Sequence, residues 1–462
     1  MKGWKTALFL ASWLILGWLS LKDTPLWSKL AAFNNHNAII SLGEAPAYDY
    51  GRMGFTRGIV RASPDNGGWT VGTDNGQVIG LNRRGELRWR RYLGIGKMIA
   101  MTYSNDGSCV LVGEQSPSGN VYMLDAATGN VLWTYSTADL VGADMNLRSY
   151  PSVMRIQTDE AGNYYIAAFR YARKNNVLSE YAGRICSLTQ NGKVRWLFPD
   201  KQAMDAWVSW FAVDRQGESL VFATANFESE ASIAYQSNLY WLQGQNGKLV
   251  GETVIPPIAY YGRTVMRGSP NYSRDGKLLA AMASDGRGFV YNRAGELLWE
   301  RQVSKPQLIG DSWINAVGRD ALSTKYGVAF TMVNTYNRDN WQLATPLEHP
   351  SSNSFFMFNN DGAFQYQWRA GGGIEEVDVG NDIAVIGVGR NMRTRDIGVH
   401  GAAVLRLSDG KLLDKLSTEG PCQAVALSAD GKSIAAIEAP ALMPDGKIIG
   451  AYRLHIHDIK ED

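Results

Sequence analysis

Cysteine side chains are the first candidates in this sequence for redox or metal chemistry. The three cysteines, Cys109, Cys186 and Cys422, are far apart and lie in or at the start of apolar runs. Because no Cys-x-x-Cys pair occurs, the spacing gives no support for a disulfide framework, a cysteine-ligated zinc site or haem attachment. Cysteine is among the most buried residue types, so we expect three buried free thiols.

Histidine and glutamate pairs are the next candidates. His455 and His457 are two residues apart, so on a β-strand they would share one face and could approach one metal ion. The other ligands of such a site are not evident, and we expect no metal centre. Glu375 and Glu376 are adjacent and would point to opposite faces of a strand, which does not suit a general acid–base pair.

Sequence patterns of common enzyme classes are absent from the chain. It contains no G-x-S-x-G, no H-E-x-x-H and no P-loop pattern. The glycine triplet 371–373 precedes a strand-like segment instead of a helix, so it is a poor phosphate cradle. The sequence therefore predicts no catalytic residue, no metal and no cofactor, and it leans against an enzyme without deciding the question.

Arginine, tyrosine and tryptophan side chains gather in the segments that separate apolar runs. The candidate binding residues of this kind are Arg148, Tyr150, Arg170, Arg173, Trp207, Tyr260, Tyr261, Arg263, Trp313, Arg390, Arg393 and Arg395. Such residues dominate protein–protein interfaces. They would also suit an anionic ligand or a glycan, and several could instead anchor long loops.

A glycine-containing segment recurs through the chain and identifies the elements that carry these residues. Its glycines stand at positions 85, 129, 192, 247, 295, 362 and 410, a period of about 54 residues, which is typical of repeat architectures. Four of the repeats place a tryptophan four residues after the glycine, at Trp89, Trp133, Trp196 and Trp299. Strand alternation would put the residues two and four after the glycine on one face, and we expect the tryptophans to fill the gaps between blades.

Tight turns form a second series between the glycine segments. Examples are NDG at 105–107, RDG at 274–276 and ADG at 429–431, each between two apolar strands. The two series together predict four antiparallel strands per repeat, which is a β-propeller blade. The last repeat lacks its fourth strand, and the segment Asn37 to Gly43 would supply it and close the ring. We expect eight blades, with seven as the alternative.

The segment DAATGNVLW at 125–133 matches the D-x-x-T-G-x-x-x-W signature of quinoprotein-type repeats. On this motif the chain resembles the quinoprotein-like (PQQ-type repeat) eight-bladed β-propeller superfamily over residues 37–462. Enzymes of that superfamily carry adjacent cysteines beside the quinone, and this sequence has none. The resemblance therefore implies a non-enzymatic member without a cofactor.

The N-terminal residues form an element outside the repeats. An apolar run from Thr6 to Leu21 follows Lys2 and Lys5 and is flanked by Lys22 and Asp23. We expect residues 1–22 to be an uncleaved signal-anchor, that is, a transmembrane helix, with a cleaved signal peptide as the alternative, and residues 23–36 to be a linker. Basic residues before the run keep the N-terminus cytoplasmic, so the rest would be extracytoplasmic: periplasmic, at the cell surface, or secreted after cleavage.

The loops on the two faces of the predicted ring differ in length. The A–B and C–D turns are uniformly tight, whereas long segments such as 170–182, 255–263, 335–352 and 439–449 fall between the B and C or the D and A strands. Loops that elaborate a scaffold commonly carry its function. A net charge of +2 gives no electrostatic case for nucleic acid.

Our hypothesis is a non-catalytic, membrane-tethered extracytoplasmic propeller that binds protein partners of the cell envelope through its long-loop face. The alternatives are an exported quinoprotein-like enzyme, or a receptor for a small ligand or glycan at the central channel.

Overall fold

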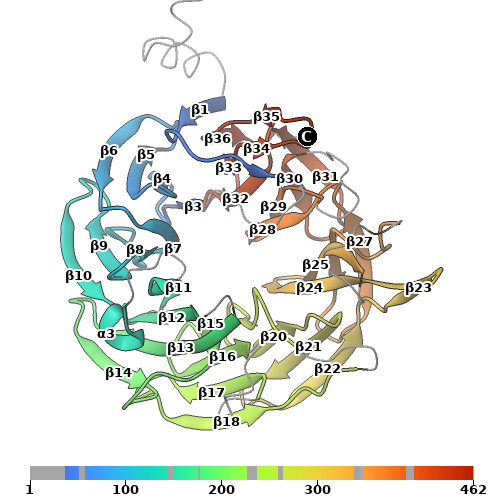
Figure 1. The fold of residues 1–462 in the computed structure, drawn as a ribbon, viewed down its shortest axis with the longest axis horizontal. Coiled ribbons are helices and arrows are strands. Elements are labelled where there is room, and N and C mark those ends of the chain that lie inside the picture. The colour runs from blue at the N-terminus through green and yellow to red at the C-terminus, as the bar shows by residue number, and fades with distance from the viewer. Residues whose placement is uncertain are drawn as a thin grey trace, which may run out of the picture.

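Antiparallel β-sheets surround a central axis in the computed structural model of the chain (Figure 1). The structure describes residues 37–50, 58–143, 149–174, 177–225, 237–258, 264–337, 345, 347–391 and 400–460. The predicted signal-anchor over residues 1–22 and the linker over residues 23–36 lie outside these ranges. In the part of the chain that is described, no helix is long and apolar enough to cross a membrane.

Most strands fall into groups of four that run outward from the axis (Figure 1). The first half of the ring contains β3 (Gly58–Ala62), β4 (Gly68–Thr73), β5 (Gln77–Asn82) and β6 (Leu87–Tyr92); β7 (Lys97–Tyr103), β8 (Cys109–Gln115), β9 (Asn120–Asp125) and β10 (Val131–Ser136); β11 (Ser152–Thr158), β12 (Tyr164–Lys174), β13 (Val177–Leu188) and β14 (Val194–Phe198); and β15 (Trp207–Val213), β16 (Ser219–Ala225), β17 (Leu239–Gln243) and β18 (Leu249–Thr253).

The second half continues the same order. It contains β19 (Asn271–Tyr272), β20 (Leu278–Met282), β21 (Arg287–Asn292) and β22 (Leu297–Gln302); β24 (Ser312–Thr324), β25 (Gly327–Asn337), β26 (Ser354–Phe358) and β27 (Phe364–Arg369); β28 (Ile374–Val379), β29 (Ile383–Val388), β30 (Gly401–Arg406) and β31 (Leu412–Ser417); and β32 (Cys422–Leu427), β33 (Ser433–Glu438), β36 (Arg453–Asp458) and β1 (Asn37–Ser41).

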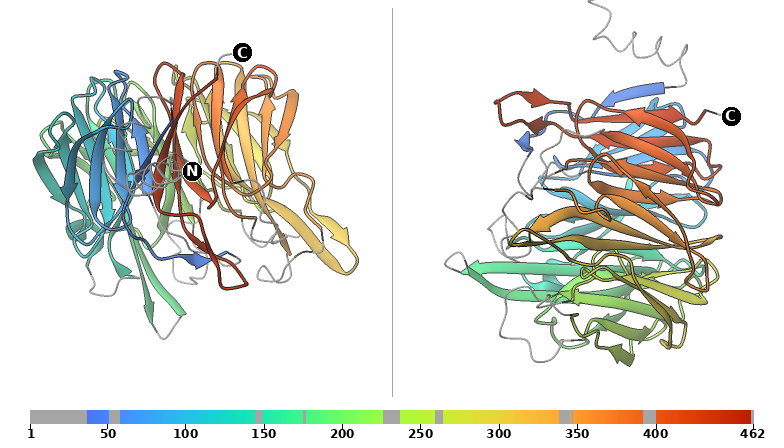
Figure 2. Two further views of the ribbon diagram at one scale, coloured as in Figure 1. Left: turned by 90° about the horizontal axis from the view of Figure 1, so that it is seen from above. Right: turned by 90° about the vertical axis from the view of Figure 1, so that its right-hand side faces the viewer.

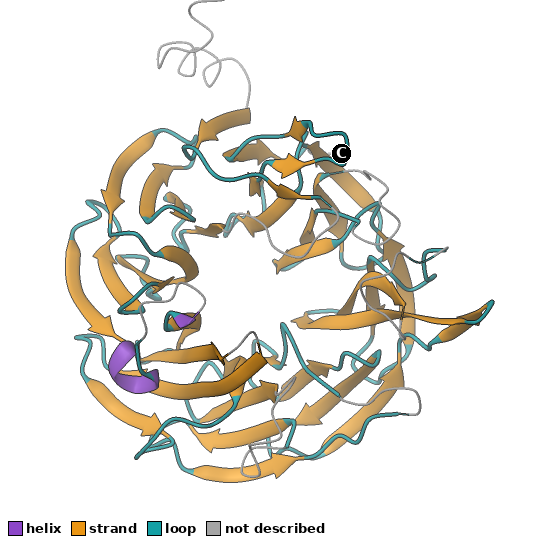
Figure 3. Ribbon diagram, viewed as in Figure 1, coloured by secondary structure: helices purple, strands orange, loops and turns teal. Residues whose placement is uncertain are grey.

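A few elements fall outside these groups. Strand β23 (Gln307–Ile309) extends the β24–β27 sheet, and β2 (Tyr48–Asp49), β34 (Ala441–Leu442) and β35 (Ile448–Ile449) form a small sheet of their own. The only named helix in the described ranges is α3 (Ala138–Val141). Strands thus make up nearly all of the regular structure (Figure 3), and the predicted all-β propeller is confirmed.

Strand β1 joins the two ends of the chain. It pairs antiparallel with β36 in a register that runs from Asn37 opposite His457 to Ser41 opposite Arg453. On its other side β36 pairs with β33. The outermost strand of the last sheet therefore comes from the N-terminal part of the chain.

The two histidines of β36 contact different carboxylates instead of sharing one site. The Nε2 of His455 lies 2.6 Å from Oε2 of buried Glu438, and the Nε2 of His457 lies 2.8 Å from Oδ2 of Asp414. Among the residues described, no three His, Cys, Asp or Glu side chains are grouped to hold a metal ion.

The core is a series of apolar layers between neighbouring sheets. In one layer Val78 and Trp89 pack with Met98 and Val110 of the next sheet. In another, Ile456 and its neighbours in the last sheet pack with residues of the first. Each sheet is therefore buried on both faces by the two sheets beside it, which explains the continuous apolar inner strands.

In the outer strands, the second residue after the repeat glycine does not point in the direction that the sequence predicts. Leu87 is 58% exposed, whereas Trp89 is 6% exposed, so the expectation that they share a face is wrong. The cause is a β-bulge: Leu87 pairs with Leu81 and Trp89 with Gly80, which leaves Arg88 as the extra residue. Because adjacent partners lie on opposite faces, the bulge turns the tryptophan inward. The other six glycine-segment outer strands have the same register shift.

The repeat tryptophans contact the glycine turn of the following sheet. Each indole Nε1 donates to a backbone carbonyl there: Trp89 to Ala126 at 2.9 Å, Trp133 to Gln190 at 2.9 Å, Trp196 to Gly244 at 2.9 Å and Trp299 to Asn360 at 2.8 Å. The rings lie against Gly129, Gly192, Gly247 and Gly362 respectively. These contacts join consecutive sheets at their outer edges.

All three cysteines carry free thiols. Cys186 and Cys422 are buried, while Cys109 is half-buried, so the expectation of a buried thiol does not hold at Cys109. Burial raises the pKa of the Cys186 thiol to about 12.

Candidate binding face

The long connections gather on one face of the ring, which we call the looped face. Figure 2 shows the long β12–β13 hairpin and the β23–β24 hairpin projecting on one side of the disc, with the C-terminus on the other. The opposite, tight-turn face consists of short turns such as those at Gly85, Gly107 and Gly129. The elements of the looped face therefore project further from the ring than the short turns of the opposite face.

Arginine and histidine side chains fix the chain segments that connect consecutive sheets on the looped face. The Nε of Arg170 donates to the carbonyl of Val141 at 2.9 Å, and the Nε of Arg184 donates to Pro199 at 2.9 Å. His349 Nε2 lies 2.8 Å from the carbonyl of Lys305. A carbonyl in a connection of this kind needs a donor because it has no strand partner.

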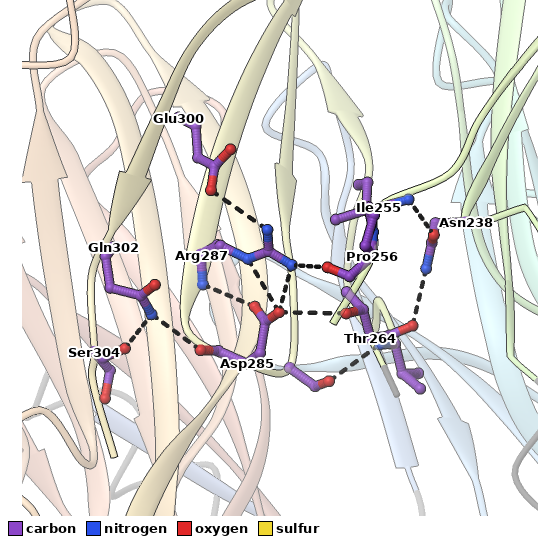
Figure 4. Close-up of polar contacts among 11 residues, drawn as sticks. Asn238, Ile255, Pro256, Thr264, Asp285, Arg287, Glu300, Gln302 and Ser304 are labelled. Atoms are coloured by element: carbon purple, nitrogen blue, oxygen red, sulfur yellow. Dashed lines mark hydrogen bonds and ion pairs between the residues drawn. The ribbon is translucent and has the colours of Figure 1, made fainter. Parts of the chain in front are cut away.

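One such network is drawn in Figure 4. The fully buried carboxylate of Asp285 accepts from Nε of Arg287 at 3.0 Å and from Nη2 at 2.6 Å. The same Nη2 donates to the carbonyl of Pro256 at 2.6 Å, and Nη1 approaches Glu300 at 3.4 Å. Burial opposes the charge of Arg287, but Asp285 and Glu300 outweigh burial and raise the pKa of the guanidinium. A buried pair held by additional hydrogen bonds positions a loop firmly.

The rest of the network fixes the two ends of the connection from β18. Asn238 accepts from the backbone N–H of Ile255 at 2.6 Å and donates to the carbonyl of Thr264 at 2.9 Å (Figure 4). The Oγ1 of Thr264 donates to Asp285 at 3.3 Å. Gln302 donates to the carbonyls of Asp285 and Ser304. This segment of the looped face is thus built on satisfied polar contacts.

Five of the predicted binding residues have side chains in the described ranges. Arg390 is 3% exposed, and its Nη1 donates to the carbonyl of Asp49 at 3.0 Å. Its guanidinium therefore binds another segment of the same chain. Arg170 donates to Val141, as given above. Trp207 packs on Phe169 with 5.8 Å between ring centroids. Tyr150 and Trp313 are half-buried.

The remaining predicted residues cannot be placed in this way. Arg173 belongs to β12, and its side chain is not described. Arg148, Tyr260, Tyr261, Arg263, Arg393 and Arg395 lie outside the described residues.

Exposed apolar side chains of the looped face are a group that the sequence reasoning missed. They are between 37% and 72% exposed: Tyr92, Ile95, Val254, Leu308, Leu347, Leu442 and Ile448. Leu442 and Ile448 are cross-strand partners in the small β34–β35 hairpin. The turn sequence PDG at 444–446 between apolar residues was the signal that could have located this hairpin.

The channel along the ring axis contains a cavity of about 520 Å³. Its charged lining includes Arg61, Arg319, Glu375 and Glu376 from three of the inner strands. Arg61 pairs with Glu376 at 3.0 Å. Both glutamates border the cavity, and the expectation that they point to opposite faces fails because the register of β28 shifts between Ile374 and Glu376.

Comparisons with known proteins bear on the fold. The family model described as outer membrane protein assembly factor BamB matches residues 20–197. Among curated proteins, no sequence match was found. The crystal structure of BamB from Moraxella catarrhalis is similar with 13% identity and a TM-score of 0.52, covering 90% of this chain and 99% of that chain.

A second solved structure is more distant. The β-propeller domain of Cps50 (Swd1) from Myceliophteria thermophila has 10% identity and a TM-score of 0.45, covering 92% of this chain and 100% of that one. The repeated glycine–tryptophan contacts, the ring of sheets and the BamB likeness agree with one another. The chain therefore has a β-propeller fold, and over residues 20–197 it is similar to the family of PQQ-repeat propellers that BamB represents.

Proposed function

We propose that this protein is a non-catalytic scaffold that binds protein partners through its looped face. The observation that carries the proposal is the set of exposed apolar side chains on elements that project from that face, above all Leu308, Leu442 and Ile448. Exposed apolar groups on a rigid, polar-anchored support are typical of interaction sites. The similarity of residues 20–197 to BamB, an outer membrane protein assembly factor, supports partners in the cell envelope.

We further propose an eight-bladed ring. The four-stranded groups of the described residues, with β1 counted in the last, support eight blades over seven. The long β7–β14 sheet divides into two blades because only Ser152 and Gln115 pair across the division.

The proposed membrane tether has a definite geometric consequence. Gly85 lies in a tight turn, and a Cβ there would stand 3.1 Å from Ala38 Cβ and 3.0 Å from Ile40 Cδ1. Strand β1 therefore begins beside the tight-turn face. An anchor over residues 1–22 would hold that face toward the membrane and leave the looped face free for extracytoplasmic partners.

Site-specific photo-crosslinking tests the scaffold proposal. A photoreactive amino acid at Ile448 or at Leu308 should give a discrete protein adduct in cells, identified by mass spectrometry. Leu297 is the control, because it is 50% exposed and apolar but lies on outer strand β22. The proposal expects the same adduct from both looped-face positions and its loss in a Leu442→Asp variant. Adducts that form equally at Leu297, or none at either looped-face position, would contradict it.

A further inference from the structure

Arg155 is a channel-lining arginine whose positive charge has no partner of opposite sign. It lies on β11 next to a register shift, between Val153 and Arg155, that brings both Met154 and Arg155 to the cavity wall. Its Nη2 donates to Oδ1 of Asn271 at 3.1 Å. Its Nε is buried without a hydrogen-bond partner, and no carboxylate of the described residues lies within ion-pair distance.

The other two arginines of the cavity are satisfied. Arg61 pairs with Glu376 and donates to the carbonyl of Val60 at 2.8 Å. Arg319 donates to the carbonyls of Ile374 and Glu375. Arg155 is therefore the cavity arginine with donors to spare, and burial together with the charge of Arg61 lowers its pKa to about 9.

The carboxylates near Arg155 already have donors. Oε1 of Glu376 pairs with Arg61, and its Oε2 accepts from the backbone N–H of Val425 at 3.1 Å. Oδ2 of Asp320 accepts from Thr331 at 2.7 Å. Arg155 therefore lacks a negatively charged acceptor of its own, and a buried unpaired donor is costly unless a partner completes it.

The surroundings of Arg155 define the kind of anion that fits. Its guanidinium carbon lies 4.0 Å from the ring centroid of Trp210, a cation–π contact that fixes the plane of the guanidinium. Apolar groups line the cavity on several strands: Ile59, Met101, Met154, Ile156 and Leu322. A volume of about 520 Å³ lies in the range of small-molecule sites.

We propose that the central channel binds a small apolar molecule with a single carboxylate, which Arg155 holds in the plane of its guanidinium. A planar carboxylate matches the arginine fork, and the apolar remainder of the ligand lies against the methionine and aliphatic side chains. The four carboxylates of the lining, Asp320, Glu375, Glu376 and Asp378, oppose a second negative charge on the ligand. This site is separate from the looped face, so it stands independently of the scaffold function.

Isothermal titration of the full chain with hexanoate tests the proposal, with the uncharged isostere hexanamide as the ligand control. We expect saturable binding of hexanoate at one site, and binding weaker by about tenfold or more for hexanamide and for an Arg155→Gln variant. Arg90→Gln is the protein control, because it removes the same charge from an exposed outer-strand position. Equal binding by wild type and Arg155→Gln would overturn the proposal, as would saturable binding of inorganic phosphate with no binding of hexanoate.

A second measurement covers the case in which Arg155→Gln fails to fold. In protein labelled with ¹⁵N-arginine, the Nε–H signal of Arg155 is identified by its absence from Arg155→Lys. We expect hexanoate to move this signal and hexanamide to leave it in place. A signal that neither compound moves at millimolar concentration would overturn the assignment.

Discussion

The indole ring of Trp89 lies against Gly129 of the following sheet, so closely that a Cβ on the glycine would stand 2.4 Å from ring atom Cε3. The glycine and the tryptophan of the repeat motif therefore do not contact each other within one repeat. Each tryptophan instead packs on the glycine of the next repeat, as also at Trp133 and Gly192. The motif thus specifies packing between neighbouring sheets, which explains why it does not identify a particular enzymatic activity.

Replacing Gly129 with alanine should destabilise the ring more than its backbone conformation alone explains. Gly129 has φ of +70°, and the new methyl group would overlap Trp89. We expect a loss of roughly 2 to 5 kcal/mol in the free energy of unfolding, from left-handed strain and overpacking together. Gly446→Ala is the control, since its φ is +83° and nothing lies within 4 Å of the added group. Urea unfolding of the two variants should differ; equal losses would mean that the contact contributes nothing.

The indole hydrogen bonds of the repeat should be separable from the packing. The repeat that begins at Gly247 has Gly251 where four other repeats have a tryptophan. Trp241, the cross-strand partner of Gly251, packs against Gly295 of the next sheet instead. Its Nε1 is buried without a hydrogen-bond partner, unlike that of Trp89. We expect Trp89→Phe to cost about 1 kcal/mol more than Trp241→Phe, since only the former loses a hydrogen bond. Thermal unfolding measures the difference, and a larger cost at position 241 would refute this explanation.

Glu438 should make the closing sheet sensitive to acid. Burial opposes its ionisation, but hydrogen bonds from His455, Arg453 and the N–H of Gly420 outweigh burial and hold its pKa at about 2. A carboxyl whose folded pKa is depressed stabilises the protein above its unfolded pKa, near 4.5, and that stability is lost as pH falls toward 2. The contribution is of the order of 3 kcal/mol.

Unfolding measured between pH 6 and pH 3 checks this prediction. The wild type should lose stability over that range more steeply than Glu438→Gln, which has no carboxyl to titrate at this position. Parallel pH profiles for the two proteins would show that Glu438 is not the source.

Adjacent residues of β1 should lose different amounts of stability on the same substitution. Ile40 packs on the apolar layer between the last and first sheets, whereas Ile39 is 59% exposed on the other face of the strand. Ile40→Asp should cost roughly 2 to 4 kcal/mol because it places a charge in an apolar layer, and Ile39→Asp should cost less than about 1 kcal/mol. Circular dichroism during heating distinguishes them. Similar melting of both variants would mean that β1 contributes little to closing the ring.

The sequence was sufficient for the propeller because its turns and glycine segments are local signals. The bulges in the outer strands were not predictable, because the extra residue has no common type: it is Arg88 in one sheet, Leu132 in another and Gln365 in a third. A bulge is a property of backbone register, not of one side chain. The exposure of Leu87 could therefore not be predicted from the sequence.

The candidate site was predictable only as a face. Arg390 belongs to a basic segment that the sequence predicts to be exposed. It nevertheless donates to the carbonyl of Asp49, 341 residues earlier in the chain. Contacts over such a distance depend on closure of the ring and leave no trace in the local sequence. The long insertions located the looped face, whereas the side chains exposed on it had to be found in the structure.

The pairing of β1 with β36 also sets the order of events during synthesis. Asn37 lies 420 residues before His457, to which it is hydrogen-bonded. At ribosomal rates of about 5 to 20 residues per second, the first strand waits roughly 20 to 80 seconds for its partner. During that time the earlier sheets can form but the circle stays open, with one strand edge unpaired and prone to association. Strand β1 is thus synthesised before the other strands of the ring and is the last to pair in its sheet.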